Sequence, residues 1–137
     1  MKDRKKIRLT LLALLALVLL CGCGSEQPEG KIRDLEFTVL EESDIPKPLA
    51  EVIEENKETE MKVSYQNEGY LYICRGFGKQ ETGGYSIQVP QCYLAEDGIH
   101  VKFELIGPPH EEKIKEEASY PYIVIKMEGM DKTILFE

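Results

Sequence analysis

Few residues of this 137-residue chain are of types that could do catalytic chemistry. The chain has two histidines, His100 and His110, and two cysteines beyond its N-terminal region, Cys74 and Cys92. Nucleophilic catalysis needs a Ser, Cys or Thr beside a base that a third group orients. We expect His100 on the polar face of a strand and His110 in a charged loop, so both histidines are predicted to be solvated surface residues. No serine lies in a nucleophile-elbow pattern, and a Cys–His dyad has no local support. The chain is therefore predicted not to be an enzyme.

Metal and cofactor sites are not predicted either. Zinc sites need His or Cys ligands at short spacing, and the sequence has no CxxC, HxxxH or HxH pair. The acidic run "EEKIKEE" at 111–117 lacks the glycine-containing alternation of a calcium loop, so we interpret it as a solvated face. No cofactor is expected.

The stretch "GKQETGGYSIQV" at 78–89 is the most distinctive loop candidate. Phosphate-binding glycine loops follow a strand and open a helix, whereas Gly83 and Gly84 are followed by a strand pattern. We predict that these glycines set positive φ in a hairpin connection and that Tyr85 begins a core-facing strand. Thr82 and the preceding "KQE" are better placed for contact with a partner. We take the whole motif, Thr82, Gly83, Gly84 and Tyr85, as the candidate recognition loop.

The same hairpin bears on the two cysteines. If 70–77 pairs with 85–93, Cys74 faces roughly Gln88, and Cys92 lies about four residues, or about 13 Å, further along. Bridged Cα atoms must be within about 7 Å. This favours two free, partly buried thiols, although a disulfide between them stays open in an oxidising compartment.

The elements that must position these residues are mostly strands. Leu35, Phe37 and Val39 alternate with polar residues, as in a half-buried strand. The segment 47–58 predicts one amphipathic helix, because its apolar residues repeat at helical spacing and Pro48 suits a first turn. Further strands are expected in "MKVSYQ", "GYLYICRGF", "GYSIQVPQCYLA", "GIHVKFELIG", "YPYIVIKM" and "KTILFE", the last two around the "EGMD" turn. We predict a small α+β domain whose six to seven strands form a mainly antiparallel sheet.

The N-terminus predicts where the protein resides. A basic head precedes the apolar run 9–20, which is too short for a membrane span of about 20 residues but typical of a signal peptide. The run ends in "LCGC", which resembles a bacterial lipobox. This resemblance implies cleavage before Cys23 and attachment of diacylglycerol to it; the alternative is an uncleaved anchor helix. We expect 1–22 to be a lipoprotein signal peptide, 23–31 a tether, and 32–137 one domain in the cell envelope, outside the cytoplasmic membrane.

Charge narrows the choice of partners. The chain has 17 Lys+Arg and 25 Asp+Glu, and the residues before Cys23 hold five basic and one acidic residue. The mature chain thus has 12 basic against 24 acidic residues, a net charge of −12. Nucleic-acid binding needs a basic face, so it is excluded. Docking on anionic lipid by charge is also disfavoured.

Three segments in order resemble the C-terminal domain of the protease-complex subunit PrcB family. They are "YLYICRGFGKQETGGYSIQV", "GIHVKFELIGPP" and "SYPYIVIKM". The matching positions are Thr82, Gly83, Gly84, Tyr85, Ile87, Val89, Pro108, Pro109, Pro121 and Tyr122. The resemblance covers about 34–127. It implies a non-catalytic surface lipoprotein that associates with an extracellular protease.

The leading hypothesis is a non-enzymatic, lipid-anchored binding or assembly module, with a surface or secreted protease as a candidate partner. One alternative is a loop-based protease inhibitor, since "ETGGY" resembles the Thr-Gly-aromatic loop of chagasin-like inhibitors. Another is an envelope-sensing lipoprotein.

Overall fold

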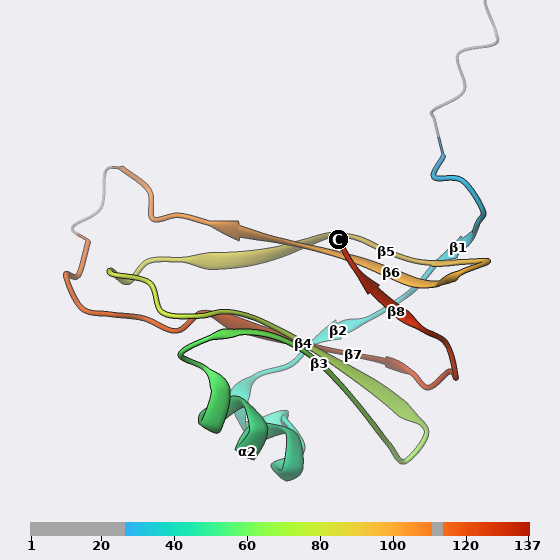
Figure 1. The fold of residues 1–137 in the computed structure, drawn as a ribbon, viewed down its shortest axis with the longest axis horizontal. Coiled ribbons are helices and arrows are strands. Elements are labelled where there is room, and N and C mark those ends of the chain that lie inside the picture. Colours follow the sequence, from blue (N-terminus) through green and yellow to red (C-terminus); the bar gives the residue numbers. More distant parts are fainter. Residues whose placement is uncertain (1–26, 111–113) are drawn as a thin grey trace, which may run out of the picture.

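The computed structural model describes residues 27–110 and 114–137. Two four-stranded sheets stack face to face, and a helix covers the outer face of one of them (Figure 1). The strands are β1 (Lys31–Asp34), β2 (Thr38–Val39), β3 (Glu60–Asn67), β4 (Tyr70–Phe77), β5 (Ser86–Ala95), β6 (Gly98–Ile106), β7 (Tyr122–Glu128) and β8 (Ile134–Phe136). A 3-10 turn, η2 (Glu42–Asp44), and the helix α2 (Lys47–Asn56) lie between β2 and β3.

The first sheet has the order β1-β5-β6-β8, and the second has the order β2-β7-β4-β3. All neighbouring strands are antiparallel except β6 and β8, which are parallel. The predicted α+β class with mainly antiparallel pairing is confirmed. The prediction of one strand around Leu35 to Val39 is wrong in detail. The structure has two short strands, β1 and β2, one in each sheet, because the chain crosses the sandwich between them.

The main core lies between the two sheets. It contains ten buried residues, contributed by both sheets and by the first crossing: Leu35, Leu71, Ile73, Cys92, Ile99, Val101, Phe103, Ile123, Ile125 and Met127. Alternate residues of each strand point to the same face. Alternation predicts an inward face made of Ile99, Val101, Phe103 and Leu105. The first three are buried, and Leu105 is partly buried.

A second core lies between α2 and the outer face of the second sheet. Leu49 and Ile53 of the helix pack there with Met61, Tyr72, Cys74 and Val124. The predicted helix is confirmed, and it ends at Asn56, two residues before the expected end. Pro48 lies in its first turn, where the missing N–H removes no intrahelical bond.

The predicted hairpin of 70–77 with 85–93 is wrong. β4 pairs with β3 and β7, and β5 pairs with β1 and β6 in the other sheet. β4 has four consecutive buried residues, 71–74, so both of its faces are covered and it lies inside its sheet. The segment 78–85 therefore crosses the sandwich. β7 and β8 are likewise in different sheets and do not form a hairpin.

The two cysteines are free, as the sequence favoured, but for another reason. Cys74 packs under the helix and Cys92 packs between the sheets, so a layer of β-sheet separates their side chains. Burial raises the pKa of Cys74 to about 12. Burial and the nearby Asp34 carboxylate raise the pKa of Cys92 to about 11. Both thiols are buried and protonated at neutral pH, which makes them poor nucleophiles.

A histidine fastens the short strand β8 to β6. His100 Nε2 lies 2.6 Å from Asp97 Oδ1, and its Nδ1 bonds Glu137 Oε1. Its ring stacks on Tyr93 with 4.8 Å between centroids. The side chain is only 14% exposed, so the prediction of a solvated His100 is wrong, whereas His110 is exposed as expected. Hydrogen bonds to the two carboxylates raise the pKa of His100 above its ordinary 6.5.

Truncating the buried face of the helix should destabilise the domain. Ile53 is 3% exposed and Val52 is 37% exposed. We expect Ile53→Ala to lower the free energy of unfolding by about 2–5 kcal/mol, because it leaves a cavity under the helix. Val52→Ala, its neighbour on the solvent side, should change the free energy by less than about 0.5 kcal/mol. Urea unfolding measures both. Equal effects would contradict the packing described.

The His100 cluster should make stability depend on pH. A group whose folded pKa is raised stabilises the fold fully below its unfolded pKa, and this contribution is lost as pH rises through the folded pKa. The Tm difference between the wild type and His100→Gln should therefore be largest at pH 5–6 and shrink towards pH 9. Thermal unfolding at fixed ionic strength measures it. His110→Gln is the control and should show no such trend. A constant difference for His100→Gln would refute the charged pairing.

Candidate functional site

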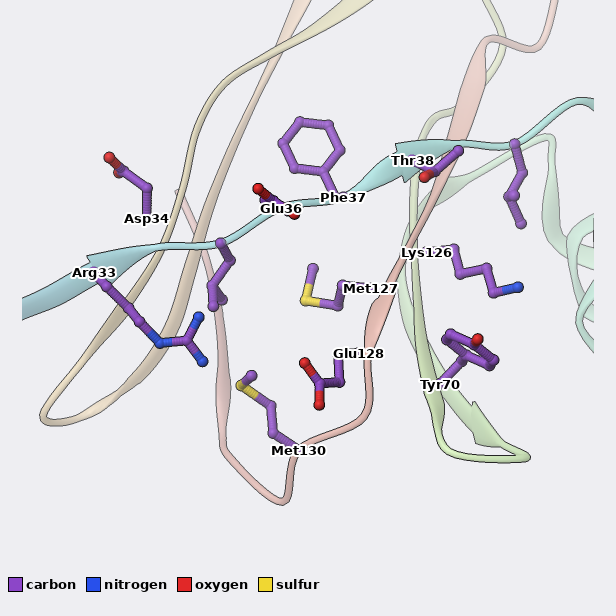
Figure 2. A pocket seen from close by; sticks show the side chains of 12 residues that line it. Arg33, Asp34, Glu36, Phe37, Thr38, Tyr70, Lys126, Met127, Glu128 and Met130 are labelled. Carbon is purple, nitrogen blue, oxygen red and sulfur yellow. The ribbon is translucent and has the colours of Figure 1, made fainter.

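A groove of about 980 Å³ opens where the chain passes from the first sheet to the second (Figure 2). Its walls are the crossing between β1 and β2, the end of β7, the start of β4 and the loop after β7. The lining residues are Arg33, Asp34, Leu35, Glu36, Phe37, Thr38, Leu40, Tyr70, Lys126, Met127, Glu128 and Met130.

The groove exists because β2 leaves β7 early. β2 pairs with β7 only at Thr38 and Val39, opposite Lys126 and Ile125. The chain before Thr38 turns away to reach the first sheet, where Leu35 N–H donates to the Cys92 carbonyl over 3.0 Å. Among the described residues, no strand therefore lies on that side of the last two residues of β7, Met127 and Glu128.

The backbone of β7 is open along this edge. Leu40 N–H donates to the Val124 carbonyl over 2.9 Å, so even-numbered residues of β7 direct their backbone groups towards β2. By the two-residue period of a strand, Glu128 directs its N–H and C=O the same way, beyond the end of β2. The groove thus offers a backbone donor and acceptor beside its side chains.

The groove has an apolar floor and a charged rim. Leu35 and Met127 belong to the core, and Phe37 and Met130 pack against it. Methionine adapts to different partners, and surfaces that bind varied segments are rich in it. The rim carries both signs of charge. Its basic residues are Arg33 and Lys126, and its acidic residues are Asp34, Glu36 and Glu128.

Tyr70 stands at the mouth of the groove. It is 45% exposed, and Lys126 Nζ lies 3.9 Å from the centroid of its ring, within the range of a cation–π contact. A smaller hollow of about 400 Å³ adjoins the groove and shares Tyr70 and Met130 with it. An extended chain lying along both hollows would pass over this tyrosine.

The predicted recognition loop lies at the other end of β4, away from the groove. It crosses from the second sheet to the first beside the returning segment 114–121 (Figure 1). Ser119 Oγ donates to the Thr82 carbonyl over 2.6 Å, and Gly83 N–H donates to the Lys115 carbonyl over 3.1 Å. The two crossings are thus bonded to each other.

The predicted positive φ is confirmed for Gly84 but is wrong for Gly83, where an added Cβ would meet Lys115 Cβ at an ordinary 3.8 Å. Gly84 has φ +86, and a Cβ there would lie 2.8 Å from Pro108 Cβ. Only glycine fits this backbone and this contact. Tyr85 is partly buried and lies near Gly107. Lys79 and Glu81 are the exposed side chains of the loop, so they are the residues a partner would meet.

The remaining sequence predictions concern metal sites, membrane spans and the N-terminus. Within 27–110 and 114–137, no three His, Cys, Asp or Glu residues gather as a metal site. No helix in that part of the chain is long and apolar enough to cross a bilayer. Cys23 and the predicted signal peptide, 1–22, lie outside the described residues, as does the start of the acidic run.

Sequence reasoning did not find the groove. Its residues are scattered over three segments, 33–40, residue 70 and 126–130, and none forms a motif. One signal was present: Met127 and Met130 lie close together beside the "EGMD" turn. Nothing in the sequence placed the first crossing beside them.

The comparisons with known proteins agree with the resemblance seen in the sequence. Residues 71–128 match the family model described as PrcB C-terminal. No curated protein and no solved structure matches the chain. The match begins in β4, contains the Thr82–Tyr85 loop and ends with β7, and so covers the middle of both sheets. The segment 71–128 is therefore similar to the PrcB C-terminal domain, and the match covers 58 of the 137 residues of the chain.

Proposed function

We propose that this protein is a non-enzymatic, lipid-anchored module of the bacterial cell envelope that binds a partner protein in the groove beside Tyr70. The observation that carries the proposal is the groove itself, with its methionine floor, charged rim and open backbone. A surface or secreted protease is the partner class that the family name suggests.

The groove suits a protein segment better than a small polar molecule. Its volume of about 980 Å³ is at the upper end of ordinary ligand pockets. Tyr, Met, Phe and Arg are enriched in protein interfaces, and all four line it. The rim can pair with charges of either sign, and the Glu128 backbone can bond to an extended chain. Burial of an apolar side chain against the partly exposed Phe37 and Met130 would supply most of the affinity, since Leu35 and Met127 are already buried.

The proposed anchor places the groove near the membrane. Lipidation at Cys23 leaves seven residues, 24–30, before β1 begins at Lys31. Seven residues reach at most about 25 Å when fully extended. Arg33 at the groove rim follows two residues later, so a partner in the groove would also lie close to the membrane surface.

Removal of the tyrosine at the mouth should release the partner. We expect Tyr70→Ala to reduce recovery of a co-purified protein at least tenfold, as for a central aromatic of an interface. The assay is purification of the full chain from native membranes in mild detergent with quantitative mass spectrometry. Tyr65→Ala, on the neighbouring strand and outside the groove, should retain the partner. Lys79→Glu tests whether the partner contacts the predicted recognition loop instead of the groove.

The outcomes separate the hypotheses. A partner lost with Tyr70→Ala and kept with Tyr65→Ala supports the groove. A partner lost only with Lys79→Glu would move the contact to the recognition loop and favour the inhibitor alternative. A chain that purifies alone at native expression levels would overturn the binding module.

The anchor has its own test. We expect Cys23→Ser to abolish incorporation of a radiolabelled fatty acid and to leave the uncleaved precursor. Cys21→Ser, two residues away, should leave labelling unchanged, because Cys23 has Gly22 immediately before it and Leu20 at the third position before it. Labelling that is lost only with Cys21→Ser would show that the lipid is attached at Cys21. Labelling that is unchanged in both variants would show that neither cysteine carries a lipid.

A further inference from the structure

Half of β6 has no neighbour on one side within the described residues. β6 spans Gly98–Ile106, but the parallel strand β8 pairs only with Ile99, His100 and Val101. Figure 1 shows the β5–β6 ribbon continuing well past the C-terminal end of β8. The remaining segment of β6, 102–106, is called the free edge below.

The direction of the backbone groups on the free edge follows from the bonds to β8. Ile99 N–H donates to the Thr133 carbonyl over 2.8 Å, and Glu137 N–H donates to the Val101 carbonyl over 2.9 Å. Odd-numbered residues of β6 therefore face β8, and the two-residue period extends this to Phe103 and Leu105. Each presents one donor and one acceptor outward, so the free edge offers four backbone groups.

The opposite edge of the same ribbon carries a proline and a bulge, which this edge lacks. Beyond β1, β5 contains Pro90 and a register shift between Gln88 and Gln91. Proline and bulges are the devices by which proteins block strand addition. The free edge of β6 has neither. Its two charged side chains, Lys102 and Glu104, bond to each other over 3.4 Å.

The sandwich also leaves β3 uncovered. Ser64 and Gln66 pair across the strands with the core residues Ile73 and Leu71 of β4, so they and the alternate residues Glu60 and Lys62 share the face that looks towards the first sheet. All four are exposed. The second sheet therefore extends beyond the first at β3, and an added strand would not collide with an apolar layer.

We propose that the free edge of β6 accepts an extended, net-basic segment of a partner protein as an additional strand. The five residues of the edge match a segment about 16 Å long at the ordinary strand rise. Its backbone would bond to Phe103 and Leu105, and its inward side chains would cover the partly exposed Leu105. β8 shows that this edge accepts a parallel neighbour.

Charge selects this occupant over a second copy of the chain. The mature chain carries 12 basic and 24 acidic residues, so two copies repel each other while a basic segment is attracted. Antiparallel self-pairing of 102–106 would also place Glu104 opposite Glu104 of the second copy, and like charges directly opposite are destabilising. The inference rests on the proposed function as a binding module, but it concerns a different surface from the groove.

The test uses the full-length chain in detergent and a defined probe. The probe is the capped peptide Thr-Val-Lys-Val-Thr-Val-Lys, and its counterpart has Glu in place of both Lys. Amide NMR with titration should show protection and shifts at Phe103 and Leu105. We expect the basic peptide to bind at least tenfold tighter than the acidic one, and added salt to narrow this ratio.

A matched pair of variants locates the edge. Leu105 and Ile87 are cross-strand partners, both partly buried and both with outward-facing N–H groups, on opposite edges of the ribbon. Leu105→Pro removes one of the two outward N–H donors of the free edge and should weaken binding of the basic peptide at least tenfold. Ile87→Pro makes the same change on the β5 edge and should leave affinity within twofold. Circular dichroism confirms that both variants are folded. If Leu105→Pro does not fold, the deciding measurement is whether the basic peptide protects the amides of Phe103 and Leu105 in the wild type.

Several results would overturn the inference. These are shifts elsewhere than at the free edge, equal loss with both proline variants, or equal binding of the acidic peptide. A concentration-dependent dimer that Leu105→Pro abolishes would replace the partner segment by a second copy. Tyr70→Ala should leave peptide binding intact. If the co-purified partner is lost with Tyr70→Ala but the peptide never binds, the edge proposal fails while the proposed function stands.

Discussion

The structure depends on the double burial of β4 and β7. Both central strands carry apolar side chains on both faces: Ile73 and Ile125 point into the sandwich, while Cys74 and Val124 point towards the helix. A strand of this kind cannot leave either face in water, because burial of apolar surface is the main stabilising term. The second sheet therefore needs the first sheet on one side and α2 on the other. A three-layer domain follows.

This constraint decides how the chain is connected. With β4 and β7 side by side in one sheet and β5 and β6 in the other, the chain must cross the sandwich after β4 and again before β7. The two crossings run together at one end and bond through Thr82 and Ser119. The first crossing, from β1 to β2, lies by the other end of β7 and opens the groove. The family motif thus serves the topology, and the surfaces suited to binding lie elsewhere.

Short strands create the two open surfaces. β2 pairs with β7 at two positions, which leaves the edge beside Met127 open, and β8 pairs with β6 at three, which leaves 102–106 without a neighbour among the described residues. An unpaired edge is a liability in an isolated domain. A module that works by assembly can use such an edge. Both proposed contacts arise from the same feature, a sandwich whose edge strands are shorter than the strands they adjoin.

Local patterns in the sequence predicted most elements correctly. The helix followed from the spacing of Leu49 and Ile53, and the inward face of β6 followed from strict alternation, because periodicity reports which side of an element is buried. The freedom of the cysteines was also favoured, though from a hairpin that does not exist. Pairing was mispredicted because adjacency in sequence usually means adjacency in a sheet, and here it does not.

The sequence by itself determined most of the elements and their buried faces, the resemblance of its middle segment to the PrcB C-terminal domain, and the expected targeting signal, since each depends on residues close together in the chain. Only the tertiary structure decided which strands are neighbours, that His100 holds Glu137 beside Asp97, and that a groove lies beside Tyr70. These features join residues up to tens of positions apart. Their positions follow from how two sheets and a helix cover β4 and β7 together, which no local pattern contains.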